Sequence, residues 1–114
     1  HMAGDYVLQM IAGICQNAVR DIDTVARIGG EEYAILLQST AVNGAMRTAE
    51  RIRKETEAFS FKYDEARFRV TVSLGVAELT DESWSITEFM KAADEMLYKA
   101  KNSGRNRCVA RNIG

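Results

Sequence analysis

Apolar residues along this chain recur at two different spacings, and the two spacings predict two kinds of secondary structure. Three stretches place them three or four positions apart, as on one face of an amphipathic helix: 7–18, 43–59 and 86–100. Asn43 is expected to cap the second helix, and Ser85 with Glu88 predicts a capping box before the third. Gly104 is expected to stop that third helix.

Short runs rich in strand-forming residues lie between these helices. The runs 24–28 and 33–37 flank two glycines and two glutamates, which favours a hairpin because glycine adopts the positive φ angles of a tight turn. Over 68–76, apolar and polar residues alternate, the period of a strand with one face in the core. A charged connection is expected over 60–67, and a last short strand over 108–110.

The order of these elements predicts an α+β fold in which helices cover an antiparallel-rich sheet. A length of 114 residues suits one domain, and 46% hydrophobic with 27% charged residues is the composition of an ordinary globular protein. The leading His1-Met2 resembles the scar of an expression tag, which leaves 3–114 as the domain.

Charge and cysteine content argue against several classes of protein. Fifteen basic against sixteen acidic residues do not suit a nucleic-acid binder that neutralises many phosphates at once. Because no run of eighteen apolar residues occurs, no membrane contact is expected from this piece. Cys15 and Cys108 lack metal-type or disulfide-type spacing and are expected to be buried apolar side chains of a cytoplasmic protein.

One short motif, Gly29-Gly30-Glu31-Glu32, has the residue types of a phosphate and metal site. Two glycines let backbone amides approach a phosphate closely, and a carboxylate beside them could hold a magnesium ion that bridges to it. The two glutamates would point to opposite faces of a strand, so they would not serve one ion equally. Taken alone, the motif also suits a plain hairpin with solvated acidic side chains.

Charged residues near the helix ends form three further candidates, each with a structural alternative. Lys101 and Arg105 could converge on one ligand if the helix continues that far, or could only complement the helix dipole. Arg20 and Asp23 could form a surface ion pair of little energetic value. Asp5 could be an N-terminal helix residue that the dipole favours.

Together, the order and intervals of these residues resemble the GGDEF-domain family of diguanylate cyclases, from about Gly4 to Arg111. The family's signature loop is similar to 27–33, with glutamate as a familiar variant at its third position and Tyr33 as a conservative exchange for the usual phenylalanine. The segment 72–77 resembles the family's penultimate strand. The resemblance implies a nucleotidyl-cyclase palm-like fold that lacks its first strand.

The resemblance also implies roles for the residues of the loop and of the first helix. Gly29 and Gly30 would bear the triphosphate of GTP through backbone amides, and Glu31 would bind Mg²⁺ or Mn²⁺. Glu32 would support nucleotide and metal handling. Asp5, in a glycine-aspartate pair typical of the family, would accept hydrogen bonds from the guanine edge.

Two more sets of residues match motifs of the family. Lys101 and Arg105, in its C-terminal motif, would contact the substrate phosphates. Arg20 and Asp23 match the arginine-x-x-aspartate inhibitory site for cyclic di-GMP, and Arg51 sits where a second arginine of that site is often found.

The implied activity is the condensation of two GTP molecules into cyclic di-GMP with release of pyrophosphate, carried out by an antiparallel pair of domains and inhibited by the product. Members of the family carry an upstream strand with a second metal-binding aspartate, followed by a guanine-reading asparagine, and this chain begins after both. We therefore expect little activity from the chain alone, and self-association into a homodimer through an unpaired strand edge.

Two alternatives stay open. The chain could belong to a non-catalytic sensor of cyclic di-GMP, or it could be a dimerisation module that binds no guanine nucleotide. The parent protein could itself be membrane-anchored.

Overall fold

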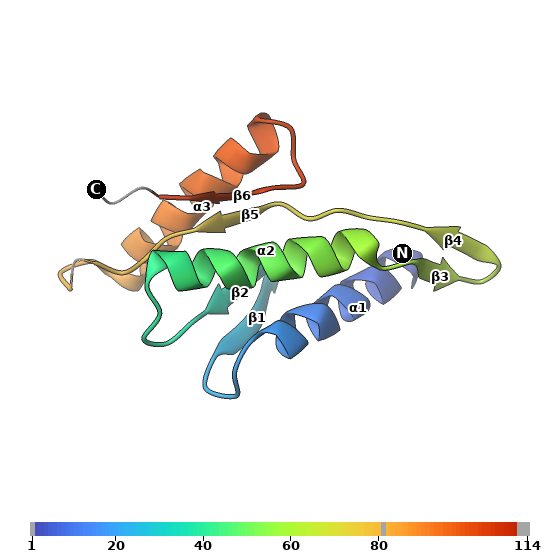
Figure 1. Ribbon diagram of the computed structural model, residues 1–114, viewed down its shortest axis with the longest axis horizontal. Helices are drawn as coiled ribbons and strands as arrows, with labels where there is room; N and C mark the ends of the chain where they lie inside the picture. Colours follow the sequence, from blue (N-terminus) through green and yellow to red (C-terminus); the bar gives the residue numbers. More distant parts are fainter. Residues whose placement is uncertain (1, 81, 112–114) are drawn as a thin grey trace.

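The computed structural model describes residues 2–80 and 82–111, which form three helices and three pairs of short strands (Figure 1). In chain order the elements are α1 (Met2–Ala18), β1 (Thr24–Gly29), β2 (Glu32–Leu36), α2 (Val42–Ala58), β3 (Phe61–Tyr63), β4 (Ala66–Phe68), β5 (Leu74–Val76), α3 (Ile86–Asn102) and β6 (Cys108–Ala110). The predicted α+β class is confirmed. His1, half of the expected tag scar, lies outside the described residues.

The strands pair locally. β1 and β2 form an antiparallel hairpin in which Val25 lies opposite Ile35, and its register shifts between Arg27 and Gly29. β3 and β4 form a second antiparallel hairpin, whereas β5 and β6 are parallel. The expected antiparallel-rich arrangement is therefore confirmed, although the described strands form three two-stranded sheets and not one.

The core lies where α2 and α3 meet the β5–β6 pair. Small and apolar side chains of both helices are buried there: Ala49, Ile52, Ala92, Met96 and Ala100. Thr56 is also fully buried, and its hydroxyl donates to the backbone oxygen of Ile52 at 2.8 Å, so its polar group is satisfied. Gly75 of β5 lies directly against the backbone of α3, which brings strand and helix unusually close.

The start of α2 differs from the prediction. The N-cap residue is Ala41 and not Asn43, and it makes no side-chain capping bond. Instead the carboxylate of Glu78, which follows β5, accepts a hydrogen bond from the amide of Val42 at 2.8 Å. A carboxylate at a helix N-terminus satisfies a free amide and complements the dipole, so a distant residue supplies the cap.

The expected strand over 68–76 was wrong as a single element, and so was the expected loop over 60–67. Residues 61–63 of that loop form β3 and 66–67 belong to β4. Of the alternating run, only Phe68 lies in β4 and only Leu74–Val76 in β5. Alternation reports which side chains face the interior, but a strand also needs a neighbour with which to pair. The β3–β4 hairpin lies at the same end of the molecule as the N-terminus (Figure 1).

Aromatic packing explains the β3–β4 hairpin. Phe61 is 0% exposed, its ring stacks on Phe68 at 5.8 Å between centroids, and it meets Phe59 edge-on at 4.7 Å. Tyr6 of α1 packs against Phe61 and Tyr63. Such aromatic pairs stabilise beyond their buried area, so this cluster fixes the hairpin against the first turns of α1.

The helix α3 begins and ends as predicted. Ser85 and Glu88 form the capping box, and the helix stops at Asn102, before Gly104 with its φ of 128°. In the described ranges, no helix has the length and hydropathy needed to cross a bilayer.

Candidate functional site

The 29–32 turn joins β1 to β2 and has the geometry of an open backbone cradle. Gly29 and Gly30 have φ angles of 154° and 50°, which L side chains rarely adopt, and a Cβ at either position would meet nothing within 4 Å. Arg27 stabilises the turn, because its Nε and one Nη atom both donate to the backbone oxygen of Gly30, at 2.9 and 2.7 Å. The two glycines are thus exposed, and Arg27 fixes the local conformation of the turn.

Glu31 and Glu32 follow the glycines, and both are exposed. Among the described residues, no cluster of three or more His, Cys, Asp or Glu side chains is placed to hold a metal ion. Magnesium commonly takes one or two protein carboxylates and fills its other positions with phosphate oxygens and water. The turn therefore fits a metal ion that arrives with a bound triphosphate, not one held by protein ligands alone.

Asp5 is exposed in the first turn of α1. Its neighbour Tyr6 anchors that turn: the Tyr6 hydroxyl accepts from the Lys62 amide at 3.4 Å, and the ring packs on Tyr63 at 5.7 Å. The Asp5 carboxylate is consequently presented to solvent from a helix end that is held in place.

Tyr33 links the turn to the same helix. Its hydroxyl donates to the backbone oxygen of Leu8 in α1 at 2.8 Å, and the bond is partly buried. The contact was not predicted from the sequence, in which this tyrosine is only a conservative exchange for phenylalanine. The signal available was the hydroxyl itself, since a buried tyrosine usually finds an acceptor.

The condition under which Lys101 and Arg105 would share one helical face is not met, although Lys101 does lie in the last turn of α3. The helix ends at Asn102, so it does not run to Arg105 and the two cations are not on one helical face. Arg105 and Asn106 have left-handed φ angles of 61° and 47°, and the Arg105 amide donates to the Ala100 carbonyl at 3.0 Å. Arg105 is exposed on a sharply turned loop.

Asn106 is the residue that holds this loop, and sequence reasoning did not identify it. Its side-chain oxygen accepts from Arg53 at 3.1 Å, and its side-chain nitrogen donates to Glu57 at 2.6 Å. Its backbone amide donates to the Ser73 hydroxyl at 3.1 Å. These three bonds tie the loop that carries Arg105 to α2 and to the segment before β5. The available signal was the residue type, because asparagine adopts left-handed backbone conformations more readily than most residues.

Arg20 and Asp23 form the ion pair that their spacing predicted, within a larger network. The Arg20 Nε and one Nη atom donate to the two Asp23 oxygens, each at 3.0 Å, and the Asp23 side chain is only 1% exposed. The Gln38 amide donates to Asp23 at 3.0 Å, and Arg20 also donates to Thr40. The hydrogen bond from Arg20, followed by those from the Gln38 and Arg20 amides, lowers the pKa of Asp23 to about 2.

A cavity of about 280 Å³ lies beside this pair. Its lining includes Arg20, Asp23 and Thr40, and also Arg47 of α2. Arg51 does not line it and pairs with Glu55 at 3.0 Å. The role predicted for Arg51 stays a prediction. Arg47, one helical turn earlier, is a second cation at the cavity, and no sequence motif pointed to it.

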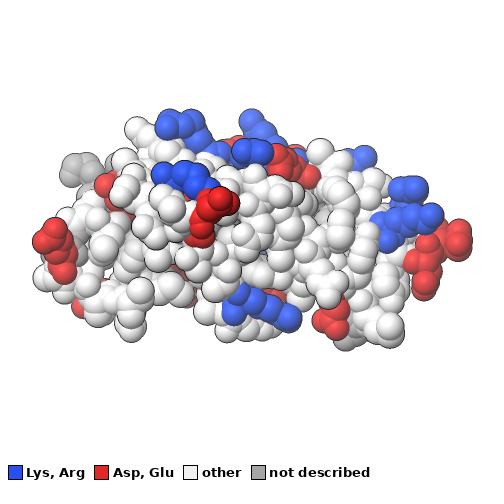
Figure 2. Space-filling model, turned by 90° about the horizontal axis from the view of Figure 1, so that it is seen from below, with Lys and Arg blue, Asp and Glu red and all other residues white. Residues whose placement is uncertain are grey.

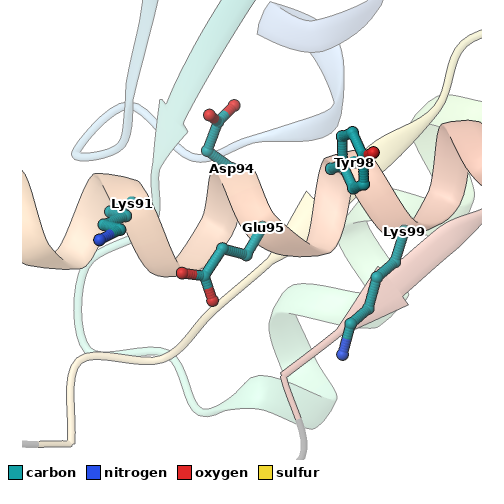
Figure 3. A pocket seen from close by; sticks show the side chains of 5 residues that line it. All are labelled: Lys91, Asp94, Glu95, Tyr98 and Lys99. Atoms are coloured by element: carbon teal, nitrogen blue, oxygen red, sulfur yellow. The ribbon is translucent and has the colours of Figure 1, made fainter.

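A larger hollow of about 470 Å³ follows the outer side of α3 (Figure 3). Its lining comes from one helix only: Lys91, Asp94, Glu95, Tyr98 and Lys99. Figure 3 shows Asp94 and Tyr98 projecting to one side and the other three side chains to the other. This hollow is larger than the cavity beside Arg20, but none of the predicted site residues lines it, so it is the weaker candidate for a binding site.

The candidate residues fall into two groups in space. Tyr33 joins the 29–32 turn to the helix of Asp5, while neither strand of this hairpin packs against α3 in the described part of the chain. Among the described residues, no hydrogen bond or ion pair joins Lys101 or Arg105 to the turn. Figure 2 shows acidic and basic side chains interspersed on one face. This face has no extended basic patch, so an anion bound there would depend on a few individual Lys or Arg side chains.

Comparisons with known proteins agree on a family. The sequence matches the family described as "Diguanylate cyclase, GGDEF domain" over residues 1–107. It is 43% identical over 107 residues to diguanylate cyclase A of Treponema denticola, a match that covers 94% of this chain and 29% of that protein. The chain thus spans under a third of the length of this relative.

Solved structures agree with the sequence matches. The active GGEEF domain of a diguanylate cyclase from Vibrio cholerae superposes with a TM-score of 0.87 at 33% identity, over 100% of this chain and 72% of that one. The GGDEF domain of DgcB from Caulobacter crescentus, solved in complex with c-di-GMP, gives 0.90 at 33% identity, over 96% and 66% of the two chains. With the open 29–32 turn and its flanking strands in place, this chain belongs to the GGDEF family of diguanylate cyclase domains.

Proposed function

We propose that the protein to which this chain belongs condenses two GTP molecules into cyclic di-GMP and releases two pyrophosphates. The observation that supports this most directly is the 29–32 turn, which combines two exposed glycines with two exposed glutamates in a chain of the GGDEF family. In each condensation the 3′-oxygen of one GTP bonds to the α-phosphorus of the other. The hydroxyl proton leaves, and the bond from that phosphorus to pyrophosphate breaks.

The residues predicted for the substrate site each have a place in this scheme. The amides of Gly29 and Gly30 bear the triphosphate, and Asp5 accepts hydrogen bonds from guanine. Lys101 and Arg105 contact phosphate oxygens. Such catalysis works mainly through positioning and electrostatic stabilisation.

The 29–32 turn is also where a metal ion would be held. Glu31 would bind Mg²⁺ or Mn²⁺ together with the triphosphate, and Glu32 would support it. When bound, such an ion favours ionisation of the attacking hydroxyl and neutralises charge on the leaving pyrophosphate.

Two copies of the domain would be needed, since each GTP supplies both an attacking hydroxyl and a phosphate under attack. An antiparallel homodimer satisfies this requirement. We expect the chain by itself to turn over GTP poorly, because the described residues offer the metal only the exposed carboxylates of the turn. Robust production of cyclic di-GMP by this chain would contradict that expectation.

Product inhibition is proposed at the cavity beside Arg20. Cyclic di-GMP carries two phosphates. Arg20 and Arg47 place two guanidinium groups at this cavity, and Asp23, in the segment between α1 and β1, also lines it. The Arg20 Nε and one Nη atom already donate to Asp23 and Thr40, which fixes the guanidinium in position and leaves its other Nη atom to donate to a phosphate. The same geometry supports the second candidate function, a sensor that binds cyclic di-GMP without making it.

The first experiment is calorimetric titration of cyclic di-GMP into the chain and into Arg20→Ala. Arg67→Ala is the matched control, because Arg67 is exposed on β4 and belongs to no site described above. We expect binding that Arg20→Ala weakens by roughly tenfold or more and Arg67→Ala leaves unchanged. Equal affinity in all three proteins would contradict the assignment of this cavity.

The substrate site is tested by titrating GTP in the presence and absence of Mg²⁺. We expect GTP binding that Mg²⁺ strengthens, and we expect Glu31→Gln to remove that strengthening. Glu65→Gln, an exposed change in the β3–β4 turn, should have no effect. If GTP fails to bind while cyclic di-GMP binds, the chain is a sensor and the cyclase proposal fails for it.

A further inference from the structure

The loop after α3 holds Arg105 in a strained backbone conformation. Gly104, Arg105 and Asn106 have φ angles of 128°, 61° and 47°, so three successive residues lie in the left-handed region. Glycine adopts such angles freely and asparagine fairly readily, whereas arginine does so rarely. Strained residues of this kind concentrate at ligand-binding and catalytic sites. An arginine at a position that suits glycine better therefore indicates that its side chain is needed there.

Asn106 joins this loop to α2. Its side-chain oxygen accepts from Arg53 at 3.1 Å, and its side-chain nitrogen donates to Glu57 at 2.6 Å. We propose that Asn106 is a positioning residue for Arg105, which fixes the loop on α2 so that the Arg105 guanidinium meets a phosphate of the nucleotide in a preset orientation. This inference rests on the proposed function, in which Arg105 contacts the substrate phosphates.

The point on α2 to which Asn106 is attached is itself fixed. The Arg53 side chain is only 16% exposed, and its Nε and one Nη atom donate to the two Glu50 oxygens at 2.9 and 3.1 Å. Its other Nη atom donates to Asn106 and lies 3.5 Å from Glu57. Both bonds of the asparagine side chain involve a charged partner, and such bonds are stronger than bonds between neutral groups. The loop is thus anchored on a rigid ion-pair network.

The backbone of Arg105 is held while its side chain is left available. Its amide donates to the Ala100 carbonyl at 3.0 Å, and its carbonyl accepts from the Arg107 Nε at 3.1 Å. The next amide, that of Asn106, donates to the Ser73 hydroxyl. Among the described residues, the exposed Arg105 side chain itself has no hydrogen-bond or ion-pair partner. Less freedom is lost when a phosphate binds an arginine whose backbone is already ordered, so this arrangement favours affinity.

Asn106→Gly separates the side chain from the backbone. Glycine keeps the left-handed angle, and its amide can still donate to Ser73, so only the bonds to α2 are lost. We expect the dissociation constant of GTP with Mg²⁺, measured by calorimetry, to rise about threefold to tenfold. In an Arg105→Ala background the same change should not alter that constant. Glu57→Ala, at a half-exposed position, removes one partner without changing the loop and should give a smaller rise, again only when Arg105 is present.

A merely structural role predicts a different pattern. Loss of stability would weaken GTP binding in both backgrounds and would also weaken cyclic di-GMP binding at the cavity beside Arg20, whereas positioning acts on GTP through Arg105 alone. Cyclic di-GMP titration of the same samples therefore separates the two roles. Asn43→Gly is the matched control, because Asn43 is exposed in the first turn of α2, and it should leave the GTP constant unchanged.

Each outcome supports or overturns the inference. Unchanged GTP affinity in Asn106→Gly would overturn it, and so would an equal loss with and without Arg105. If Arg105→Ala alone leaves GTP affinity unchanged, the arginine contacts no phosphate and the inference fails, while GTP binding at the 29–32 turn stands. If the parent chain binds no GTP, the proposed substrate site fails and this inference with it.

Discussion

Replacement of Gly75 by alanine is the change to which the fold should be most sensitive. A Cβ at this position would lie 2.2 Å from the Ala93 carbonyl oxygen, 2.2 Å from the Leu97 amide nitrogen and 2.8 Å from the Leu97 Cα. All three are backbone atoms of α3, so no side-chain rotation can relieve the overlap. Because ordinary contacts begin near 3.4 Å, β5 and α3 would have to separate by more than an ångström.

The size of the effect follows from what that separation disturbs. Inserting one carbon into a well-packed core costs about 1–3 kcal/mol, and here the displaced atoms belong to a helix whose Ala92, Met96 and Ala100 are buried. We expect Gly75→Ala to lower the free energy of unfolding by about 3 kcal/mol or more. For a domain of this size that is a fall in melting temperature of roughly 12 °C.

Gly13→Ala is a control that makes the same chemical change but should raise the free energy of unfolding. Gly13 lies in the exposed middle of α1, and a Cβ there would meet nothing within 4 Å. Alanine should stabilise that helix by up to about 1 kcal/mol. Urea unfolding, monitored by circular dichroism, measures the free energy of unfolding of both variants. If Gly75→Ala were as stable as the parent chain, the close approach of β5 to α3 would be refuted.

Three further predictions concern the cap of α2, the Asp23 carboxylate and the cysteines. Glu78→Ala removes the cap from the first amide of α2 and should lower the free energy of unfolding by about 1 kcal/mol, seen as a lower urea midpoint with an unchanged slope. The pKa of Asp23 lies below its ordinary value, at about 2. Its pairing with Arg20 should therefore stabilise the fold above about pH 4, and that contribution should disappear as pH falls through about 2. The gap in melting temperature between the parent chain and Asp23→Asn should close over that window, and a constant gap would contradict the pairing. Burial raises the pKa of Cys15 to about 11, so at pH 8 Ellman's reagent should modify Cys15 far more slowly in the folded chain than in urea.

Periodicity predicted the three helices and the first hairpin because the information for them is local. The capping box of α3 needs only Ser85 and Glu88, three positions apart, and the first hairpin needs two glycines between two strand-forming runs. The cap of α2 was missed for the opposite reason: Glu78 lies 36 positions from Val42, and no local pattern connects them. Cys108 was expected to be buried but is half-buried, with its thiol beside the Glu50 carboxylate.

The β3–β4 hairpin shows how a charged surface can hide a structured segment. Half of its residues are charged or exposed, which favoured a loop, yet Phe61 is the most deeply buried large side chain of the chain as described. Three aromatic residues, at 61, 63 and 68, were the available signal. Phe61 and Tyr63 pack against Tyr6 of α1, more than fifty positions earlier, so their partner was not visible in a local window.

For the candidate site, motif and geometry carry different information. The motif selects residues that would contact a ligand, such as Asp5, the 29–32 turn and Arg105, and these stand at the ends of three separate elements. Their separations depend on bonds between elements, which Tyr33 makes to α1 and Asn106 makes to α2. Neither bond joins neighbours in sequence, so neither could be predicted from spacing. The exchange of phenylalanine for tyrosine is therefore conservative in shape but adds a polar connection between the turn and the helix.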